Sequence, residues 1–512
     1  MQDGLNQIGI IRIGEGWGRG PCNSAKARGF KMKRKVGTLR SLAAALVAAT
    51  VLTPNIAQAL TVKEAVAVAL ESNPEIGQAA ENREAIEFEL RQARGLYLPS
   101  VDLEAGVGAR RLDNPSRRAA GIEDDELYPT DVGLSIKQKL FDGGGRRAEL
   151  ERQAARVDSA SFRVLERSET IGLQVVREYI EYLLQLQIID ETRRNVAFHR
   201  SIIGDIGSLI SGGALTEADR QQAQERLLSA TARQKEAEEE LEASKIRFYK
   251  LVGKPLVNPS SPPSVAGALP ASLDAAIGIA RRTNPRIKVA NSDIDAADAL
   301  IDSARSELFP EISLEGRARV GRDIEGTRGR TDDLEGRLVA RWNLYRGGID
   351  IANEQEQIRR ASEQRLVLHQ AFREVEEAVR ISWDRRLRQA ELAQTYRAQA
   401  AQNAQLVSSY REQLEVGQRS LLDVLGAQDT RFSVNILAKT ADYASLFAEY
   451  RILAATGTLL DTFNLQAAQQ SDAYARSAFK VPETAPTETY RRRPSRQTNN
   501  VPFDLLTPLR KQ

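Results

Sequence analysis

The sequence has few of the residues on which enzymes and metal proteins usually depend. It contains one cysteine, two histidines and two methionines in 512 residues, and only 5% of its residues are aromatic. A structural zinc site or a disulfide framework needs several Cys or His ligands, so these counts exclude most metal and thiol chemistry. Since no nucleophile, metal or cofactor constellation is apparent either, the sequence predicts a protein that is not an enzyme and holds no cofactor.

Long apolar runs are also scarce. The mean hydropathy is −0.39, and 42% of the residues are hydrophobic while 28% are charged. This balance excludes a polytopic helical membrane protein and a disordered acidic chain. The formal net charge of +3 is concentrated at the start, because the first 59 residues hold nine basic and two acidic residues, leaving 63 basic and 67 acidic residues. Nothing in the remainder predicts a nucleic-acid partner.

One apolar run lies near the N-terminus and has the order of a secretory signal. Several basic residues precede Leu42–Leu52, which leads to the small residues Ala57 and Ala59. The run is too short for a permanent transmembrane helix, and cleavage is expected after Ala59. Residues up to 59 are therefore predicted to be an upstream stretch and a signal peptide, with translation starting at Met1 or Met32.

The chain after the signal matches itself. At an offset of 211, Asn73-Pro74 aligns with Asn284-Pro285, and farther along an offset of 204 aligns Leu140–Gly144 with Leu344–Gly348. The two halves are therefore predicted to be structural duplicates.

This duplication defines the predicted domain organisation. The first repeat covers 60–255 and the second covers 271–465, with a connector rich in Pro and Ser at 256–270 between them. The segment 466–512 is rich in Pro, Thr and Gln and includes Arg491-Arg492-Arg493, so it is predicted to be a polar, solvated tail. Binding of a partner or of peptidoglycan by its arginines is the alternative.

Each half contains two segments in which apolar and polar residues alternate with a period of two. This pattern predicts strands with one apolar face, and about ten residues suit a tilted transmembrane β-strand. An exposed soluble sheet is the alternative. Polar stretches at 110–129 and 321–333 separate the strands of each pair and are predicted to be hairpin loops. The alternating segments are 101–107, 132–136, 312–320 and 338–344.

Four such strands cannot form a closed barrel, since about eight are needed even for a filled one. Open strand edges in lipid would leave backbone groups unpaired. The barrel must therefore be shared between protomers. Two copies would give eight strands with little lumen, whereas three copies give twelve strands and a channel lined by the charged face.

Proline-free stretches rich in Ala, Glu, Gln, Arg and Leu follow each strand pair and predict long helices. Residues 145–211 and 349–415 each correspond to on the order of 100 Å of helix. These helices are expected to end at glycine turns, Gly212-Gly213 and Gly417, each followed by a helix that returns alongside. A helix from about Glu75 to Leu98 is expected to stack end-on with the first return helix. The fold class is therefore mainly α with β.

The duplicated Asn-Pro unit, the Leu-Phe-Asp-Gly-Gly of Leu140–Gly144 and the segment Gly417–Leu425 resemble the TolC-type outer-membrane channels. The resemblance extends from about Leu60 to Asn464. It implies a homotrimer whose twelve-stranded barrel crosses the outer membrane of a Gram-negative bacterium and continues into a periplasmic tunnel of twelve helices. It also implies two partners, an inner-membrane transporter of ABC or RND type and a periplasmic adaptor.

In that family, contacts between helices hold the periplasmic tip closed. The matching positions of this sequence are Asp219, Arg419 and Asp423, with tip turns at Gly213 and Gly417. The resemblance therefore implies an Arg419 to Asp219 latch and a ring of Asp423 carboxylates that attracts cations. The alternative is that both aspartates stabilise the first turn of a helix.

Two tip positions depart from the family pattern. The second acidic ring position falls on Gly426, and the tip tyrosine falls on Leu414, with Tyr410 one turn earlier as a substitute. The departures leave open which contacts close the tip.

Glycine pairs follow the second strand of each half. We predict that Gly143, Gly144, Gly347 and Gly348 bend the chain from strand to helix. A phosphate cradle is disfavoured, since the second copy lacks the acidic residue of the first. His199 and His369 occupy non-equivalent repeat positions, which argues against a shared metal site.

The function that these features favour is a passive exit channel of the outer membrane, gated at the helical tip and serving type I secretion or multidrug efflux. A trimeric periplasmic coiled-coil adaptor without a pore is the alternative, but it would not need four strands of lipid-spanning length. The pore lining does not distinguish protein cargo from drugs or metals.

Overall fold

The computed structural model describes residues 60–326 and 328–485. The predicted signal peptide and the arginines at 491–493 lie outside the described residues. Within the described ranges, no helix combines the length and the apolar character that a membrane crossing requires.

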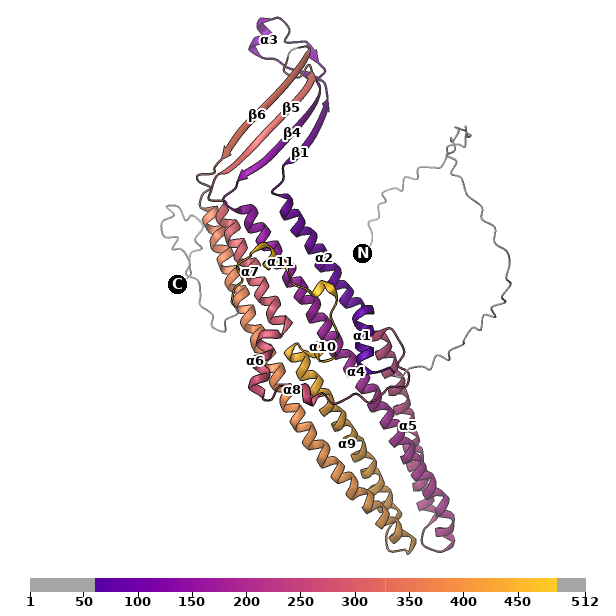
Figure 1. Ribbon diagram of the computed structural model, residues 1–512. Coiled ribbons are helices and arrows are strands. Elements are labelled where there is room, and N and C mark those ends of the chain that lie inside the picture. The colour runs from indigo at the N-terminus through magenta and orange to yellow at the C-terminus, as the bar shows by residue number, and fades with distance from the viewer. Residues whose placement is uncertain (1–59, 327, 486–512) are drawn as a thin grey trace, which may run out of the picture. The chain divides into compact units, whose positions relative to one another are not determined.

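Four helices of the first half have partners of equal length in the second half (Figure 1). The pairs contain 11, 22, 67 and 36 residues per helix. The predicted long helices are confirmed, including the bounds of α4 and α8. In chain order the pairs are α1 (Val62–Ser72) with α6 (Leu273–Thr283), α2 (Pro74–Gly95) with α7 (Pro285–Ser306), α4 (Gly145–Ser211) with α8 (Ile349–Glu415), and α5 (Glu217–Val252) with α9 (Leu421–Thr456).

The Asn-Pro pairs join helices end to end. Asn73 caps α2 by accepting a hydrogen bond from the Glu75 N–H, and its Nδ2 donates to the Leu251 carbonyl at the end of α5, 3.1 Å away. Asn284 does the same between α7 and α9, donating to the Ala455 carbonyl at 2.8 Å. These bonds place the end of each return helix against the start of a shorter helix, as end-on stacking requires.

The strands form one antiparallel sheet in the order β1-β4-β5-β6 (Figure 1). Its four strands are β1 (Ser100–Val107), β4 (Thr130–Phe141), β5 (Glu311–Arg322) and β6 (Arg330–Arg341). The four predicted strands are therefore confirmed. Each strand joins a helix at the same end of the sheet, here called the helical end, and the opposite end, where the hairpin loops lie, is called the loop end.

The stretch at 110–129 is more ordered than the predicted hairpin loop. It holds β2 (Arg110–Arg111), β3 (Glu126–Leu127) and α3 (Pro115–Ala119). Arg117 is 4% exposed, and its guanidinium donates to carbonyls of Ile122 and Gly326, so it ties this stretch to the other hairpin loop. The predicted hairpin connection is confirmed, since β1 and β4 pair antiparallel on either side of it, and the stretch has structure of its own because one buried arginine supplies donors to several backbone carbonyls.

The second predicted loop is shorter than expected. The ends of the interval 321–333 belong to β5 and β6, leaving 323–329 between the strands.

Part of the segment after α9 packs against the helices in the described range up to residue 485, although many of its residues from 466 onward are exposed. It contains α10 (Leu459–Thr462) and α11 (Ala475–Phe479), and the Arg476 side chain is buried between α4 and α7. Arg476 pairs with Asp158 at 3.0 Å and with Asp295 at 2.6 Å. For the residues around Arg476 the prediction of a solvated tail was wrong. Composition alone does not reveal that two buried carboxylates, Asp158 and Asp295, both pair with this one cation.

Candidate channel surface and gate

The sheet has one apolar and one polar face, as its register dictates. Cross-strand partners share a face, so Leu103 with Leu134 and Leu314 with Leu338 lie on one side, while Lys137, Glu315 and Arg337 lie on the other. The apolar side is exposed within one chain, with Leu103 at 72% and Leu334 at 86% exposure. Large exposed apolar surfaces mark contact with lipid or protein.

The polar face is hollowed. A cavity of about 510 Å³ lies against it and is lined almost entirely by polar-face residues of all four strands, including Asp102, Lys137, Arg317 and Arg337. The sheet therefore curves with its charged side inward, as the wall of a channel would.

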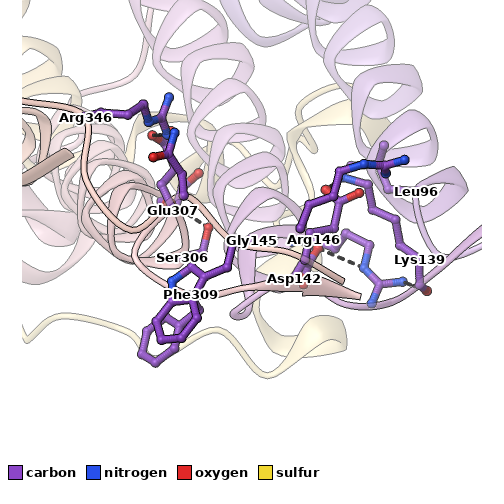
Figure 2. Close-up of a pocket in the computed structure, with 14 residues that line it drawn as sticks. Leu96, Lys139, Asp142, Gly145, Arg146, Ser306, Glu307, Phe309 and Arg346 are labelled. Carbon is purple, nitrogen blue, oxygen red and sulfur yellow. Dashed lines mark hydrogen bonds and ion pairs between the residues drawn. The ribbon is translucent and has the colours of Figure 1, made fainter. Parts of the chain in front are cut away.

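Two glycines turn the chain from β4 into α4. Gly143 and Gly144 have φ of 64° and 95°, and a Cβ on Gly143 would lie 2.7 Å from the Ser306 carbonyl oxygen. Both conditions favour glycine. A cavity of about 640 Å³ lies beside this bend, with Asp142 and Arg146 on one side and Glu307 with Arg346 on the other (Figure 2).

The Asp142 carboxylate is already engaged at the start of α4. It accepts hydrogen bonds from the backbone N–H of Arg146 at 3.0 Å and from its Nε at 2.9 Å (Figure 2). The carboxylate therefore fills the position where a helix N-terminus would hold an anion.

The second bend reverses the charges. Gly347 and Gly348 have φ of 64° and 84°, and Arg346 stands where Asp142 stands in the first half. Arg346 pairs with Asp350 at 3.0 Å and with Glu307 at 3.3 Å. The same bend is thus stabilised by an ion pair of opposite polarity.

At the far end of the long helices, the two helical hairpins pack together through an apolar cluster. Gly213 and Gly417 have φ of 80° and 73° in the turns that end α4 and α8. The buried members of the cluster come from both hairpins: Ile202, Ile206, Leu215, Ala223, Leu414, Leu421, Val424 and Leu425. Leu414, the counterpart of the family's tip tyrosine, is therefore a core residue here.

Asp219 and Asp423 both cap helices. The Asp219 carboxylate accepts from the backbone N–H and the hydroxyl of Thr216 at 2.8 and 2.7 Å, which completes a capping box. The Asp423 carboxylate accepts from the Ser420 hydroxyl at 2.8 Å. A carboxylate in the first helical turn also interacts favourably with the helix dipole.

Arg419 lies close to Asp423 and Tyr410 rather than to Asp219. Its guanidinium carbon is 4.3 Å from the centre of the Tyr410 ring, its Nε donates to Gln413 at 3.2 Å, and its Nη1 is 3.8 Å from Asp423. Within one chain, the described residues include no ion pair between Arg419 and Asp219.

The structure contains further polar contacts between the hairpins that the sequence did not reveal. Arg411 of α8 pairs with Asp205 of α4 at 2.8 Å. In the buried seam between α4 and α9, Gln428 donates to Asn195 at 2.9 Å. Buried amides need partners, so this bond specifies how the hairpins align. The sequence signal for this contact was a polar residue, such as Gln428 or Asn195, at a helix position where the pattern expects an apolar one.

His199 lies beside this seam, 1% exposed and with its Nδ1 lacking a hydrogen-bond partner. Burial lowers the pKa of the imidazole, which favours its neutral form. Across the described ranges, no group of three or more potential metal-ligating side chains comes together.

A family model described as "Outer membrane efflux protein" matches residues 65–254 and 276–458. The chain is 24% identical over 438 residues to the Outer membrane efflux protein BepC of Brucella suis, covering 83% of this chain and 92% of that protein. It is 25% identical over 400 residues to the Alkaline protease secretion protein AprF of Pseudomonas aeruginosa, covering 76% and 82%.

Solved structures share the fold. A membrane protein from Pseudomonas aeruginosa superimposes with a TM-score of 0.69 at 18% identity, covering 77% of this chain and 90% of that one.

Proposed function

This chain belongs to the outer membrane efflux protein family, and on that premise we propose that three copies form a continuous channel through the outer membrane and the periplasm. The channel provides a passive exit for substrates of a type I secretion or efflux system. It needs no catalytic residue and no cofactor.

The observation that carries this proposal is the two-faced sheet with two open edges. One face is apolar and exposed, the other is charged and concave, and β1 and β6 each have a neighbour on one side only. In lipid, each unpaired backbone group costs several kcal/mol, so a membrane sheet must close. Pairing β1 of one copy with β6 of the next closes it, and three copies give twelve strands.

The helices also support an assembly of three copies. Each chain supplies the full-length columns α4 and α8, and two composite columns in which α5 meets α2 and α9 meets α7 at the Asn73 and Asn284 joints. Three copies would therefore build a tunnel of twelve columns, each on the order of 100 Å long. Equal helix lengths in both halves allow this ring to close with near-equivalent neighbours.

For the gate, we propose that Arg419 of one protomer faces Asp219 of its neighbour at the tip. Two features support it. The Arg419 side chain is 37% exposed and its Nη1 is 3.8 Å from Asp423, so its ion pair within the described part of its own chain is long, and its closer contacts are with the uncharged side chains of Gln413 and Tyr410. The carboxylate of Asp219 lies in the first turn of α5, beside the turn that ends α4. Three copies of Asp423 would attract cations to the same opening.

The partners we propose are an inner-membrane transporter of ABC or RND type and a periplasmic adaptor. The names of relatives support both cargo types, since one is a protease secretion protein and another is a toluene efflux pump outer membrane protein. The tunnel would lie in the periplasm with its tip toward the inner membrane.

Planar-bilayer recording of the purified full chain tests the proposal. Discrete conductance steps, together with a particle mass three times that of one chain, are expected. A folded trimer that never inserts would contradict it and favour the coiled-coil adaptor, although that alternative leaves the exposed apolar face of the sheet unexplained.

A further inference from the structure

The charges on the concave face are unevenly distributed along the strands. The register sorts the polar-face residues into rows that run across the sheet, for example Lys137, Glu315 and Arg337 in one row. The rows nearest the helical end hold four cations and two carboxylates, a net charge of +2. We call this set the basic band, and its members are Lys137, Lys139, Glu311, Glu315, Arg337 and Arg341.

The rows nearest the loop end have the opposite balance. They hold five carboxylates and two cations, a net charge of −3. This set is called the acidic band, and its members are Asp102, Glu104, Asp131, Arg317, Arg319, Asp333 and Glu335.

The contacts in the basic band leave cationic charge uncompensated. Glu311 is shared by Lys137 and Lys139 at 3.3 and 2.9 Å. Glu315 is shared by Arg337 and Arg341 at 3.3 and 2.8 Å. Each carboxylate balances one of its two cations, so one positive charge remains at each cluster by count, and the one at the Glu315 cluster is partly compensated because Arg337 also lies 3.6 Å from Glu335 of the acidic band. Both clusters lie at the helical end, where the helices meet the concave face.

We propose that the basic band is a specificity determinant that draws carboxylate-bearing substrates from the helical tunnel into the barrel. The inference rests on the proposed function, because it needs this face to line the lumen. In three copies the band carries a net charge of +6 and the acidic band −9, so the lumen is bipolar. A low-dielectric wall focuses such fields, which act on charges inside the pore.

The bipolar arrangement makes the effect directional. A polymer of carboxylates arriving from the helical end meets the basic band first and is held there by Coulomb attraction. The same polymer arriving from the loop end meets the acidic band first and is repelled. At about 0.1 M salt the Debye length is about 10 Å, so charges on the lumen wall still act on a polymer near it.

The test is single-channel recording of the full chain, carrying Arg419→Ser to remove the proposed tip latch, with poly-L-glutamate added to each side in turn. Two independent variants neutralise the basic band, Lys137→Gln/Lys139→Gln and Arg337→Gln/Arg341→Gln. The matched control is Arg322→Gln/Arg330→Gln, which removes two cations from β5 and β6 on the opposite face, as their register shows. Conductance steps show in each case that the protein has folded and inserted.

With the basic band intact, poly-L-glutamate should block the current for longer from the helical side than from the loop side. Either basic-band variant should shorten the helical-side block roughly threefold, as a change of about one RT in local potential would do, while the control leaves it unchanged. Equal block times with the basic band intact and in both variants, in channels that conduct, would overturn the inference and leave the proposed function standing. Folded wild-type protein that gives no conductance steps would overturn both.

Discussion

Helices α4 and α8 have the same length and equivalent places in the two halves, yet their surroundings differ. Each has 67 residues and starts after two glycines with positive φ. In α4, 31 residues are buried, but in α8 only 14 are buried. Helix α4 packs against α1, α2, α5, α7, α9, α10 and α11, whereas α8 packs mainly against α6, α7 and α9.

The difference in burial between α4 and α8 indicates that two helices of equal length can have different packing partners. Because the helices are equal in length, the two hairpins end at the same distance from the sheet. The side chains determine which elements each helix contacts. Helix α4 is the centre of the single chain. Helix α8 exposes apolar side chains that a neighbouring protomer would cover in the proposed trimer: Leu366, Val367, Ile381, Leu387, Leu392 and Leu406.

The largest effect is expected where α4 holds a buried charge that α8 lacks. Asp158 accepts hydrogen bonds from the N–H groups of Ala475 and Arg476 and pairs with the Arg476 guanidinium, whereas the equivalent residue of α8 is Ser362. Asp158→Ala should lower the free energy of unfolding by about 4 kcal/mol, because it leaves a buried cation short of one partner. Denaturant titration measures this.

Ser362→Ala is the matched control. It removes one hydrogen bond to the Ile358 carbonyl and should cost about 1 kcal/mol. If both variants cost the same, α4 is not the more critical helix.

A second contrast is pH-dependent. Burial raises the pKa of Glu169 to about 7, and one carboxylate oxygen has no hydrogen-bond partner, while the equivalent residue of α8 is Arg373. The folded state holds this proton more tightly than the unfolded chain, so stability falls as pH rises from about 4.5 to 7. Glu169→Gln should be more stable than wild type by about 3 kcal/mol at pH 8 and nearly equal to it at pH 4.

Thermal unfolding of both proteins across this range measures the difference. A gap that is the same at pH 4 and pH 8 would show that folding does not raise the pKa of Glu169.

The third contrast concerns one leucine in each helix. Leu183 is 8% exposed and its counterpart Leu387 is 49% exposed. Leu183→Ala should lower the free energy of unfolding by about 2–3 kcal/mol, since a buried side chain leaves a cavity. Leu387→Glu should leave the secondary structure intact and weaken trimer formation, because the charge would be buried between protomers.

Circular dichroism together with mass measurement in detergent separates the two effects. A Leu387→Glu protein that remains fully trimeric would place this part of α8 outside the interface.

The long helices, the four strands and the glycine turns could be predicted because their signals are local. Periodicity, the absence of proline and paired glycines each act within a few residues. Helix α1 was missed although Thr61 and Glu64 form a capping box, a signal that can be read from sequence.

The contacts of the tip and of the segment after α9 could not be predicted in the same way. The stacking of Arg419 on Tyr410, the burial of Leu414 and the pairing of Arg476 with Asp158 depend on residues that only the fold brings together. The residue that Arg419 faces across a trimer interface is still harder to predict from the sequence, because it belongs to another chain.

In the proposed trimer, this chain forms a channel whose narrowest point is held at the helical tip. Single-channel conductance of wild type beside Arg419→Ser tests it most directly, with Gln418→Ser, an exposed neighbour in the same turn, as the control. We expect steps in the wild type that grow at least about twofold in Arg419→Ser, because loss of a cation that holds the tip widens the limiting constriction, and that stay unchanged in Gln418→Ser. Equal conductance in all three folded trimers would contradict a latch at Arg419.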